Sequence, residues 1–420
     1  MKIPSVLFGG LLGFVLVSCD QAPEQTAAER AAELAQNTII IDTHIDVPFR
    51  LEDGWEDVSN ATDGGDFDYP RAVAGGLNGP FMSIYTPAVL GDGAEATANA
   101  DKLIDMMEDI VANAPGKFVL AYSVAELEHN FANGLMSFPL GMENGSPVAG
   151  ELANLEYFYN RGIRYITLTH SRANHISDSS YDENRPWGGL SPFGADVVRE
   201  MNRLGIMVDI SHVSDEAFWD ALEVSQAPMI ASHSSLRHFT PGFERNMSDD
   251  MVKALAEAGG VIMINYGSSF VTEEANMKGT AYWDAVRAFQ EETGAEDGSE
   301  EVLAFRAEFF GPAGYPYATL DDVLDHFDRV VEIAGIDYVG IGSDYDGVGD
   351  TLPIGLKDVS TYPNLVAGLL ARGYSEDDIE KILSGNILRV WRQTELNFWL
   401  SVSAKGYCGS ILSLLSLYFL

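Results

Sequence analysis

The sequence predicts an α/β fold, a (β/α)8 TIM-like barrel, and three observations support this prediction. From Thr38 onward, β-branched apolar runs alternate with helical patterns almost without pause, as in a parallel sheet covered by helices. Six of the runs end on a histidine or a carboxylate, and the C-terminal ends of barrel strands meet at one face, where active sites lie. Eight runs have the length and composition of strands, at 38–44, 79–86, 137–142, 164–169, 206–211, 228–232, 260–266 and 337–343.

Helical patterns separate most of these strands. They lie at 94–113, 150–161, 192–204, 215–223 and 248–258, and several begin with a capping residue or an acidic first turn. An open doubly wound sheet would need a glycine-rich phosphate turn after its first strand, whereas Asp42-Thr43-His44 stands there. We therefore expect a closed barrel.

Residues 1–18 have the anatomy of a lipoprotein-type signal peptide. Lys2 precedes an apolar stretch at 6–17, which is shorter than the ~20 residues needed to span a bilayer. Small residues before Cys19 resemble a bacterial lipobox. We expect lipidation of Cys19 to anchor the protein to the membrane, on the periplasmic side of a bacterial cell envelope. An ordinary secretory signal with an incidental cysteine is the alternative.

The rest of the chain divides into a tether with an N-terminal helix at 19–37, a barrel at 38–400 and an apolar tail at 401–420. The role of the tail stays open. An insertion at about 271–317 contains two amphipathic helical patterns, which we interpret as an outer helix pair or a lid over the barrel opening. With Cys19 lipidated only Cys408 remains, so no internal disulfide is expected.

Composition excludes two classes of protein. Hydrophobic residues make up 46% of the chain and aromatic residues 10%, which excludes a disordered protein. The formal net charge of −38 repels phosphate backbones, so we expect no nucleic-acid partner. Most of the acidic residues are then a solvated surface.

The side chains at the strand ends are ligands that zinc accepts. His44 and Asp46 occupy alternate positions of an extended segment, so both can face one ion. Glu143 ends an apolar run, where an ionised carboxylate is costly unless it is paired or coordinated. His212 and His233 each follow a serine at a strand end, 21 residues apart. Each histidine alone could be a core residue, but the joint pattern predicts a metal site.

Two metal ions suit this set better than one. Three histidines and two carboxylates exceed the three protein ligands that are usual for an open catalytic Zn²⁺. With Glu143 as a bridge, His44 and Asp46 would hold one ion, and His212 and His233 the other. Coordination lowers the pKa of water from 15.7 to about 7, so a metal-bridging hydroxide would be available at neutral pH.

Several motifs together resemble the renal (membrane) dipeptidase family of binuclear zinc metallopeptidases. The resemblance runs from about residue 38 to 395 and includes His44-x-Asp46, Glu143 in GMENG, His170 in LTH, His212 in SH, His233 in SHSS, Arg245-Asn246 and Asp344 in GSDYDG. It implies a (β/α)8 barrel, two Zn²⁺ bridged by Glu143, and hydrolysis of dipeptides, including those with a C-terminal D-residue.

The resemblance also implies roles for three further residues. His170 would polarise the scissile carbonyl and steady the oxyanion, and Arg245 would bind the free carboxylate of the substrate. Asp344 would carry a proton from water to the leaving amine; we prefer it to Asp346 because it directly follows the strand. A surface ion pair with Glu244 or with Asp249 is the alternative for Arg245.

We therefore expect a zinc-dependent dipeptidase that acts on L-L and L-D dipeptides. One alternative is a related binuclear-metal hydrolase of amides, lactams or N-acyl amino acids. Another is a non-catalytic, lipid-anchored maturation protein. The expected partners are a small dipeptide and, through the lipid, a membrane, while a homodimer and the preferred side chains are left open.

Overall fold

The computed structural model describes residues 25–296 and 298–404. The predicted signal segment, Cys19, Cys408 and the end of the apolar tail lie outside these residues. Within the described part of the chain, no helix has the length and apolar character needed to span a membrane.

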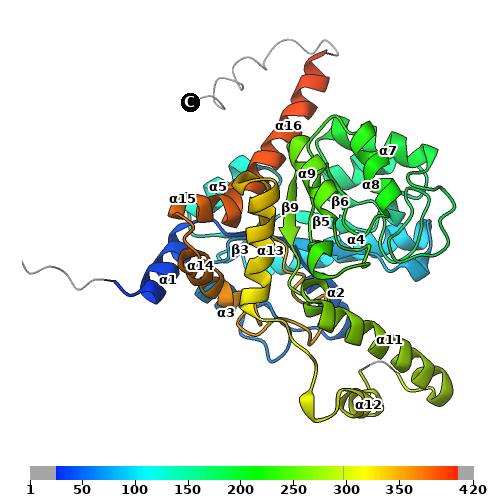
Figure 1. The fold of residues 1–420 in the computed structure, drawn as a ribbon. Coiled ribbons are helices and arrows are strands. Elements are labelled where there is room, and N and C mark those ends of the chain that lie inside the picture. Colours follow the sequence, from blue (N-terminus) through cyan, green and yellow to red (C-terminus); the bar gives the residue numbers. More distant parts are fainter. Residues whose placement is uncertain (1–24, 297, 405–420) are drawn as a thin grey trace, which may run out of the picture.

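Eight parallel strands close into a barrel, which confirms the predicted fold class (Figure 1). Neighbouring strands follow the order β1-β10-β9-β8-β7-β6-β5-β2, and each overlaps one of the eight predicted runs. The strands are β1 (Ile41–Ile45), β2 (Gly79–Tyr85), β5 (Leu140–Glu143), β6 (Ile163–Thr167), β7 (Met207–Asp209), β8 (Ile230–Ala231), β9 (Val261–Ile264) and β10 (Val339–Ile341).

Helices surround the barrel (Figure 1). They are α1 (Ala27–Asn37), α2 (Val47–Asp53), α3 (Tyr69–Gly75), α4 (Ala94–Asn113), α5 (Val124–Ala132), α6 (Ala153–Asn160), α7 (Pro192–Leu204), α8 (Asp215–Val224), α9 (Asp249–Glu257), α10 (Ser268–Val271), α11 (Glu273–Thr293), α12 (Glu300–Phe310), α13 (Leu320–Ile333), α14 (Tyr362–Ala371), α15 (Glu376–Glu380) and α16 (Asn386–Ala404).

Local signals explain where these elements begin and end. The side chain of Ser191 accepts a hydrogen bond from the backbone of Gly194 and caps α7, and Pro192 supplies the first helical φ. The predicted helix at 150–161 begins later, because Ala149 and Gly150 adopt positive φ angles of 53° and 73° that a helix cannot contain.

The predicted run at 137–142 is two strands rather than one. Met136–Phe138 forms β4, which pairs with β3 (Phe118–Leu120) outside the barrel, and only β5 enters the barrel wall. Pro139 separates them, because a residue without a backbone N–H cannot continue a ladder.

The barrel interior is a packed core. Phe81 contacts the ring of Tyr165, with 5.5 Å between centroids, and that of Trp391 from α16, at 5.3 Å. Trp391 and Tyr165 are fully buried. Ile41, Phe81 and Val261 belong to one apolar cluster and lie near the N-terminal ends of their strands. This cluster therefore fills the N-terminal end of the barrel, and polar side chains can occupy the C-terminal ends of the strands.

The insertion forms a helical hairpin of α11 and α12. The two helices pack on each other through a small cluster that contains Tyr282, Val286 and Val302. The hairpin extends to one side of the barrel (Figure 1), and Arg306 in α12 donates a hydrogen bond to the Asp350 carbonyl at 2.7 Å.

Candidate metal centre

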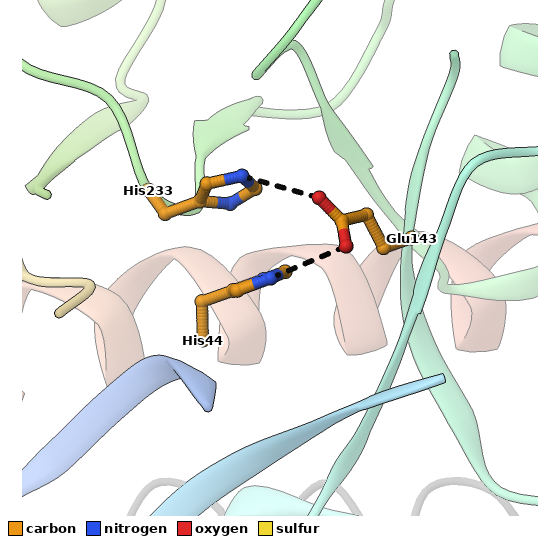
Figure 2. Close-up of side chains that lie close together, drawn as sticks. All are labelled: His44, Glu143 and His233. Carbon is orange, nitrogen blue, oxygen red and sulfur yellow. Dashed lines mark ion pairs between the residues drawn. The ribbon is translucent and has the colours of Figure 1, made fainter. Parts of the chain in front are cut away.

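The five predicted ligands come together at the C-terminal ends of four strands. His44 is in β1 and Asp46 directly follows it, Glu143 ends β5, and His212 and His233 follow β7 and β8. All five are at least nine-tenths buried. Figure 2 shows Glu143 between two rings, with one carboxylate oxygen facing His44 and the other facing His233.

The donor atoms form two groups, one at each oxygen of Glu143. Glu143 Oε2 lies 3.5 Å from His44 Nε2, which lies 3.4 Å from Asp46 Oδ2. Glu143 Oε1 lies 3.1 Å from His212 Nε2 and 3.4 Å from His233 Nε2, and these two nitrogens are 2.8 Å apart. Ligands around a tetrahedral Zn²⁺ are roughly 3.3–3.6 Å from one another, given bonds of 2.0–2.2 Å. The distances of 3.4–3.5 Å match this range, whereas His212 Nε2 lies closer to its two neighbours, at 3.1 Å and 2.8 Å. The chemistry of the donor set, histidine nitrogens and carboxylate oxygens, suits two such ions.

The ring of His44 turns its Nε2 toward the first group. The Tyr165 hydroxyl donates to the Thr43 carbonyl at 3.0 Å, so it accepts a hydrogen bond from His44 Nδ1 at 2.8 Å. His44 Nε2 is fully buried and has no hydrogen-bond partner among the described residues. Such an orphaned nitrogen beside two carboxylates is what a bound cation would satisfy.

Burial and neighbouring charges set the protonation of the ligands. Burial lowers the pKa of His212 and His233 well below the usual histidine value, which keeps both rings neutral, as metal binding requires. Burial alone would raise the pKa of the Glu143 carboxyl, but the nearby rings of His44 and His170 and the contacts with His212 and His233 hold it well below its usual range. Glu143 is therefore ionised.

His170 lies beside the second group of donor atoms. It follows β6, and its Nε2 is 3.5 Å from Glu143 Oε1. Its ring packs against His212, with centroids 4.2 Å apart, and against Tyr85 at 4.7 Å. With 21% of its side chain exposed, His170 faces the opening of the site rather than the core.

Arg245 points inward. Only 3% of it is exposed; Nη1 donates to Ser234 Oγ and Nη2 to the His233 carbonyl, both at 2.7 Å. Its Nε is buried without a hydrogen-bond partner among the described residues. The surface ion pairs considered for it do not form, because Glu244 pairs with Arg185 and Asp249 pairs with Arg329.

The two aspartates after β10 face different partners. Asp344 Oδ2 accepts a hydrogen bond from Asn265 Nδ2 at 2.7 Å, and its carboxylate belongs to one cluster with His44 and Asp46. Burial raises the pKa of Asp344 to about 7. Asp346 instead lies 3.2 Å from Arg50 Nε.

Three buried residues around the site escaped the sequence reasoning. Asn265 directly follows β9, so its strand-end position was a signal that could have revealed it. Asp209 is the last residue of β7 and shares that strand-end signal, whereas Tyr165 lies in the middle of β6, where a polar side chain gives no sign of facing a ligand ring.

Comparison with known proteins agrees with this geometry. The family described as "Membrane dipeptidase (Peptidase family M19)" matches residues 28–399. An uncharacterized dipeptidase of Schizosaccharomyces pombe is 30% identical over 372 residues, covering 85% of this chain and 81% of that protein. The dipeptidase tcpJ of Claviceps purpurea is 32% identical over 354 residues, covering 83% and 73%, respectively.

Solved structures share the fold. The probable dipeptidase PvdM from Pseudomonas aeruginosa superposes with a TM-score of 0.76 at 27% identity, covering 88% of this chain and 99% of that chain. A metallopeptidase from Rhodobacter sphaeroides, solved with a phosphinate mimic of the dipeptide L-Ala-D-Ala, has a TM-score of 0.69 at 26% identity, covering 85% and 100%. The chain therefore belongs to the membrane dipeptidase family, the M19 metallo-dipeptidases, as its motifs predicted.

Proposed function

We propose that this protein is a zinc-dependent dipeptidase that holds two Zn²⁺ per chain and hydrolyses L-L and L-D dipeptides. The placement of Glu143 between two groups of donor atoms carries the proposal, since each oxygen faces nitrogens at 3.1–3.5 Å. The dipeptide mimic bound by the Rhodobacter sphaeroides relative supports the substrate class, including the D-residue.

The donor set assigns the residues that would hold each ion. His44, Asp46 and Glu143 would hold one, and Glu143, His212 and His233 the other. When bound, the pair of ions supplies a hydroxide nucleophile at neutral pH, because coordination lowers the pKa of water to about 7.

The remaining residues bind the substrate and move a proton. Arg245 would bind the terminal carboxylate through the N–H groups that its bonds to Ser234 and His233 leave free. His170, at the opening, would donate to the scissile carbonyl oxygen as it becomes an oxyanion. Asp344 would take the proton of the attacking water and give it to the nitrogen as the C–N bond breaks.

A substrate panel tests this function. We expect hydrolysis of L-L and L-D dipeptides that stops with a chelator and returns with Zn²⁺. An Arg245→Ala variant should lose at least about a hundredfold in kcat/KM for dipeptides, since removing one partner of a buried charge pair costs about 3–5 kcal/mol. Unchanged efficiency would favour a hydrolase of other amides or lactams. Absence of turnover in the whole panel would favour a non-catalytic protein.

We also propose that lipidation of Cys19 anchors the protein to the membrane on the periplasmic side of the cell envelope. The apolar stretch at 6–17 and the small residues before Cys19 support this. Cys19→Ser should move the protein from the membrane fraction to the soluble fraction and abolish labelling with a fatty acid. Unchanged fractionation and labelling would contradict the anchor.

A further inference from the structure

A buried carboxylate stands behind the second group of donor atoms. Asp209, in β7, is fully buried and accepts four hydrogen bonds. Its Oδ1 accepts from the backbone N–H groups of Ser211 at 3.0 Å and Ser232 at 2.8 Å. Its Oδ2 accepts from the hydroxyls of Thr167 at 2.5 Å and Ser232 at 2.6 Å. The donors of these four bonds are two backbone N–H groups and two hydroxyls, and the carboxylate oxygens accept in each.

These directions determine which nitrogen of His233 carries the proton. Ser232 gives its single hydroxyl proton to Asp209, so its oxygen must accept at the 2.7 Å contact with His233 Nδ1. The proton therefore sits on Nδ1, and Nε2 is left as a lone pair. That Nε2 lies 3.4 Å from Glu143 Oε1 and 2.8 Å from His212 Nε2, where the second ion would bind.

The other ligand rings lack this arrangement. His44 Nδ1 donates to the uncharged hydroxyl of Tyr165, and His212 Nδ1 is buried with no hydrogen-bond partner among the described residues. In the second group of donor atoms, the His233 ring is therefore linked to a carboxylate through Ser232, whereas the His212 ring has no such link in the described part of the chain. The geometry of this group depends on the hydrogen bonds made to His233.

We propose that Asp209 and Ser232 are positioning residues, which fix the tautomer and orientation of His233 and thereby set the affinity for the second metal ion. The inference rests on the proposed function only in assuming a second ion. A carboxylate or carbonyl on the outer N–H of a ligating histidine commonly has this effect. Here Asp209 reaches the His233 ring through the Ser232 hydroxyl. Replacing one carboxylate oxygen of Asp209 by an NH₂ group therefore reverses the direction of both hydrogen bonds.

Asp209→Asn makes that reversal. The side-chain oxygen that remains in the asparagine can accept from the two backbone N–H groups. The new NH₂ group then faces Ser232 and donates a hydrogen bond to its hydroxyl oxygen. Ser232 must then donate to His233 Nδ1, which moves the ring proton to Nε2. An Asp-to-Asn change behind the histidine of serine-protease triads produces the wrong tautomer in the same way. We expect the second Zn²⁺ to bind at least tenfold more weakly.

The double variant separates positioning from a general structural role. Ser232→Ala removes the connecting hydroxyl, so His233 can adopt either tautomer, and we expect a smaller loss, about threefold to tenfold, as for other outer partners of ligands. In D209N/S232A the asparagine can no longer impose the wrong tautomer, so the second ion should bind more tightly than in D209N alone. A structural role predicts that the double variant binds more weakly than either single variant.

The measurement is a titration of the metal-free, full-length protein with Zn²⁺ against a chromogenic chelator. In parallel, ¹⁵N NMR of the histidine rings reports the tautomer of His233 directly. Asp42→Asn is the matched control for the second ion. Asp42 is also fully buried and accepts from the backbone N–H groups of His44 and Ser343 and from the Tyr362 hydroxyl, but none of these hydrogen bonds reaches the ring of His212 or His233. We expect that variant to keep the second ion.

Several results would overturn the proposal. They are wild-type affinity for the second ion in D209N, additive loss in the double variant, and a wild-type protein that binds fewer than two ions. If D209N fails to fold, S232A is compared with Thr167→Val, which removes a hydroxyl from the same carboxylate oxygen without touching His233; equal losses would refute the proposal. A wild type that binds two ions yet hydrolyses no dipeptide would refute only the proposed function.

Discussion

His212 and Asp344 both adopt left-handed backbone conformations, with φ of 70° and 65°. A residue other than glycine pays on the order of 1–3 kcal/mol for such a conformation, and residues of this kind cluster at functional sites. Each residue is the third one after the end of a barrel strand, and the turn there aims their side chains at Glu143 and Asn265. At these two positions the backbone conformation lowers local stability but orients a side chain of the site.

Asp344→Asn tests the proton transfer. The amide has nearly the shape of the carboxyl but cannot carry a proton, so kcat for dipeptides should fall by about 10²–10⁴, the usual contribution of an acid–base group. Zinc content should stay at two ions, because Asp344 is not one of the five proposed ligands, although its carboxylate clusters with His44 and Asp46. Steady-state kinetics and elemental analysis check both parts, and near-wild-type turnover would remove the assigned role.

His212→Ala tests the ligand assignment. The substitution leaves Glu143 and His233 as the only protein ligands of the second ion, so dialysed protein should retain about one Zn²⁺ per chain. Tyr181→Phe is the control, because that ring packs against His212, with centroids 5.9 Å apart, without being a proposed ligand. Retention of two ions by H212A would contradict the assignment.

The residues that the sequence predicted for the site share one property: all but Arg245 lie at or just after the end of a barrel strand. That property is visible as an apolar run followed by a polar residue. Tyr165, Asp209 and Ser232 act behind the ligand rings, and their role depends on which atoms meet across strands. The pairing of β6 with β7 and of β7 with β8 determines which atoms meet. The residue pattern of one strand does not reveal this pairing.

At the scale of elements, β5 and β6 are tightly fitted behind His44. Gly141 in β5 faces the ring of Tyr165, and a Cβ added there would stand 2.0 Å from the ring carbon Cζ. Because the hydroxyl of Tyr165 holds His44 Nδ1 at 2.8 Å, the missing side chain of Gly141 leaves room for the residue that orients a ligand.

Gly141→Ala should therefore move Tyr165 and loosen His44. Overpacking of a tight core costs about 1–3 kcal/mol, so we expect lower thermal stability together with weaker binding of the ion held by His44 and Asp46. Gly134→Ala controls for loss of a glycine, since an added Cβ there meets nothing within 4 Å, although its φ of 72° adds local strain. Equal zinc affinity in G141A and wild type would contradict this role of β5.

Strand and helix patterns predicted the elements well where one signal dominates. The helices at 94–113 and 192–204 have the predicted bounds, and every predicted strand is present. The sequence did not separate β4 from β5, because both flank a single proline in one apolar run. The sequence also did not determine whether the α11–α12 hairpin covers the barrel opening, since an amphipathic pattern does not show which surface a helix packs against.

At the scale of the whole molecule, one buried carboxylate links stability to pH. Glu395 in α16 accepts a hydrogen bond from the Val124 N–H at 3.0 Å, while its other oxygen is buried with no hydrogen-bond partner among the described residues. Burial raises the pKa of Glu395 to about 7. Its contribution to stability is therefore fully present below pH 4.5 and is lost as the pH rises through 7.

Glu395→Gln should stabilise the metal-free protein at pH 8 by roughly 1–3 kcal/mol and change it little at pH 5, because a pKa shift of one unit corresponds to about 1.4 kcal/mol. The amide keeps an acceptor for Val124 and carries no charge. Urea unfolding at the two pH values measures the difference, and the rest of the acidic chain titrates equally in both proteins. An equal effect of the substitution at pH 5 and pH 8 would contradict the prediction.

The central claim is that Glu143 bridges two zinc ions between His44 and Asp46 on one side and His212 and His233 on the other. Anomalous diffraction at the zinc edge, from crystals of the protein grown with Zn²⁺, tests it most directly. We expect two peaks about 3.5–4 Å apart, one within bonding distance of each Glu143 oxygen. A single peak, or peaks that do not contact Glu143, would contradict the claim.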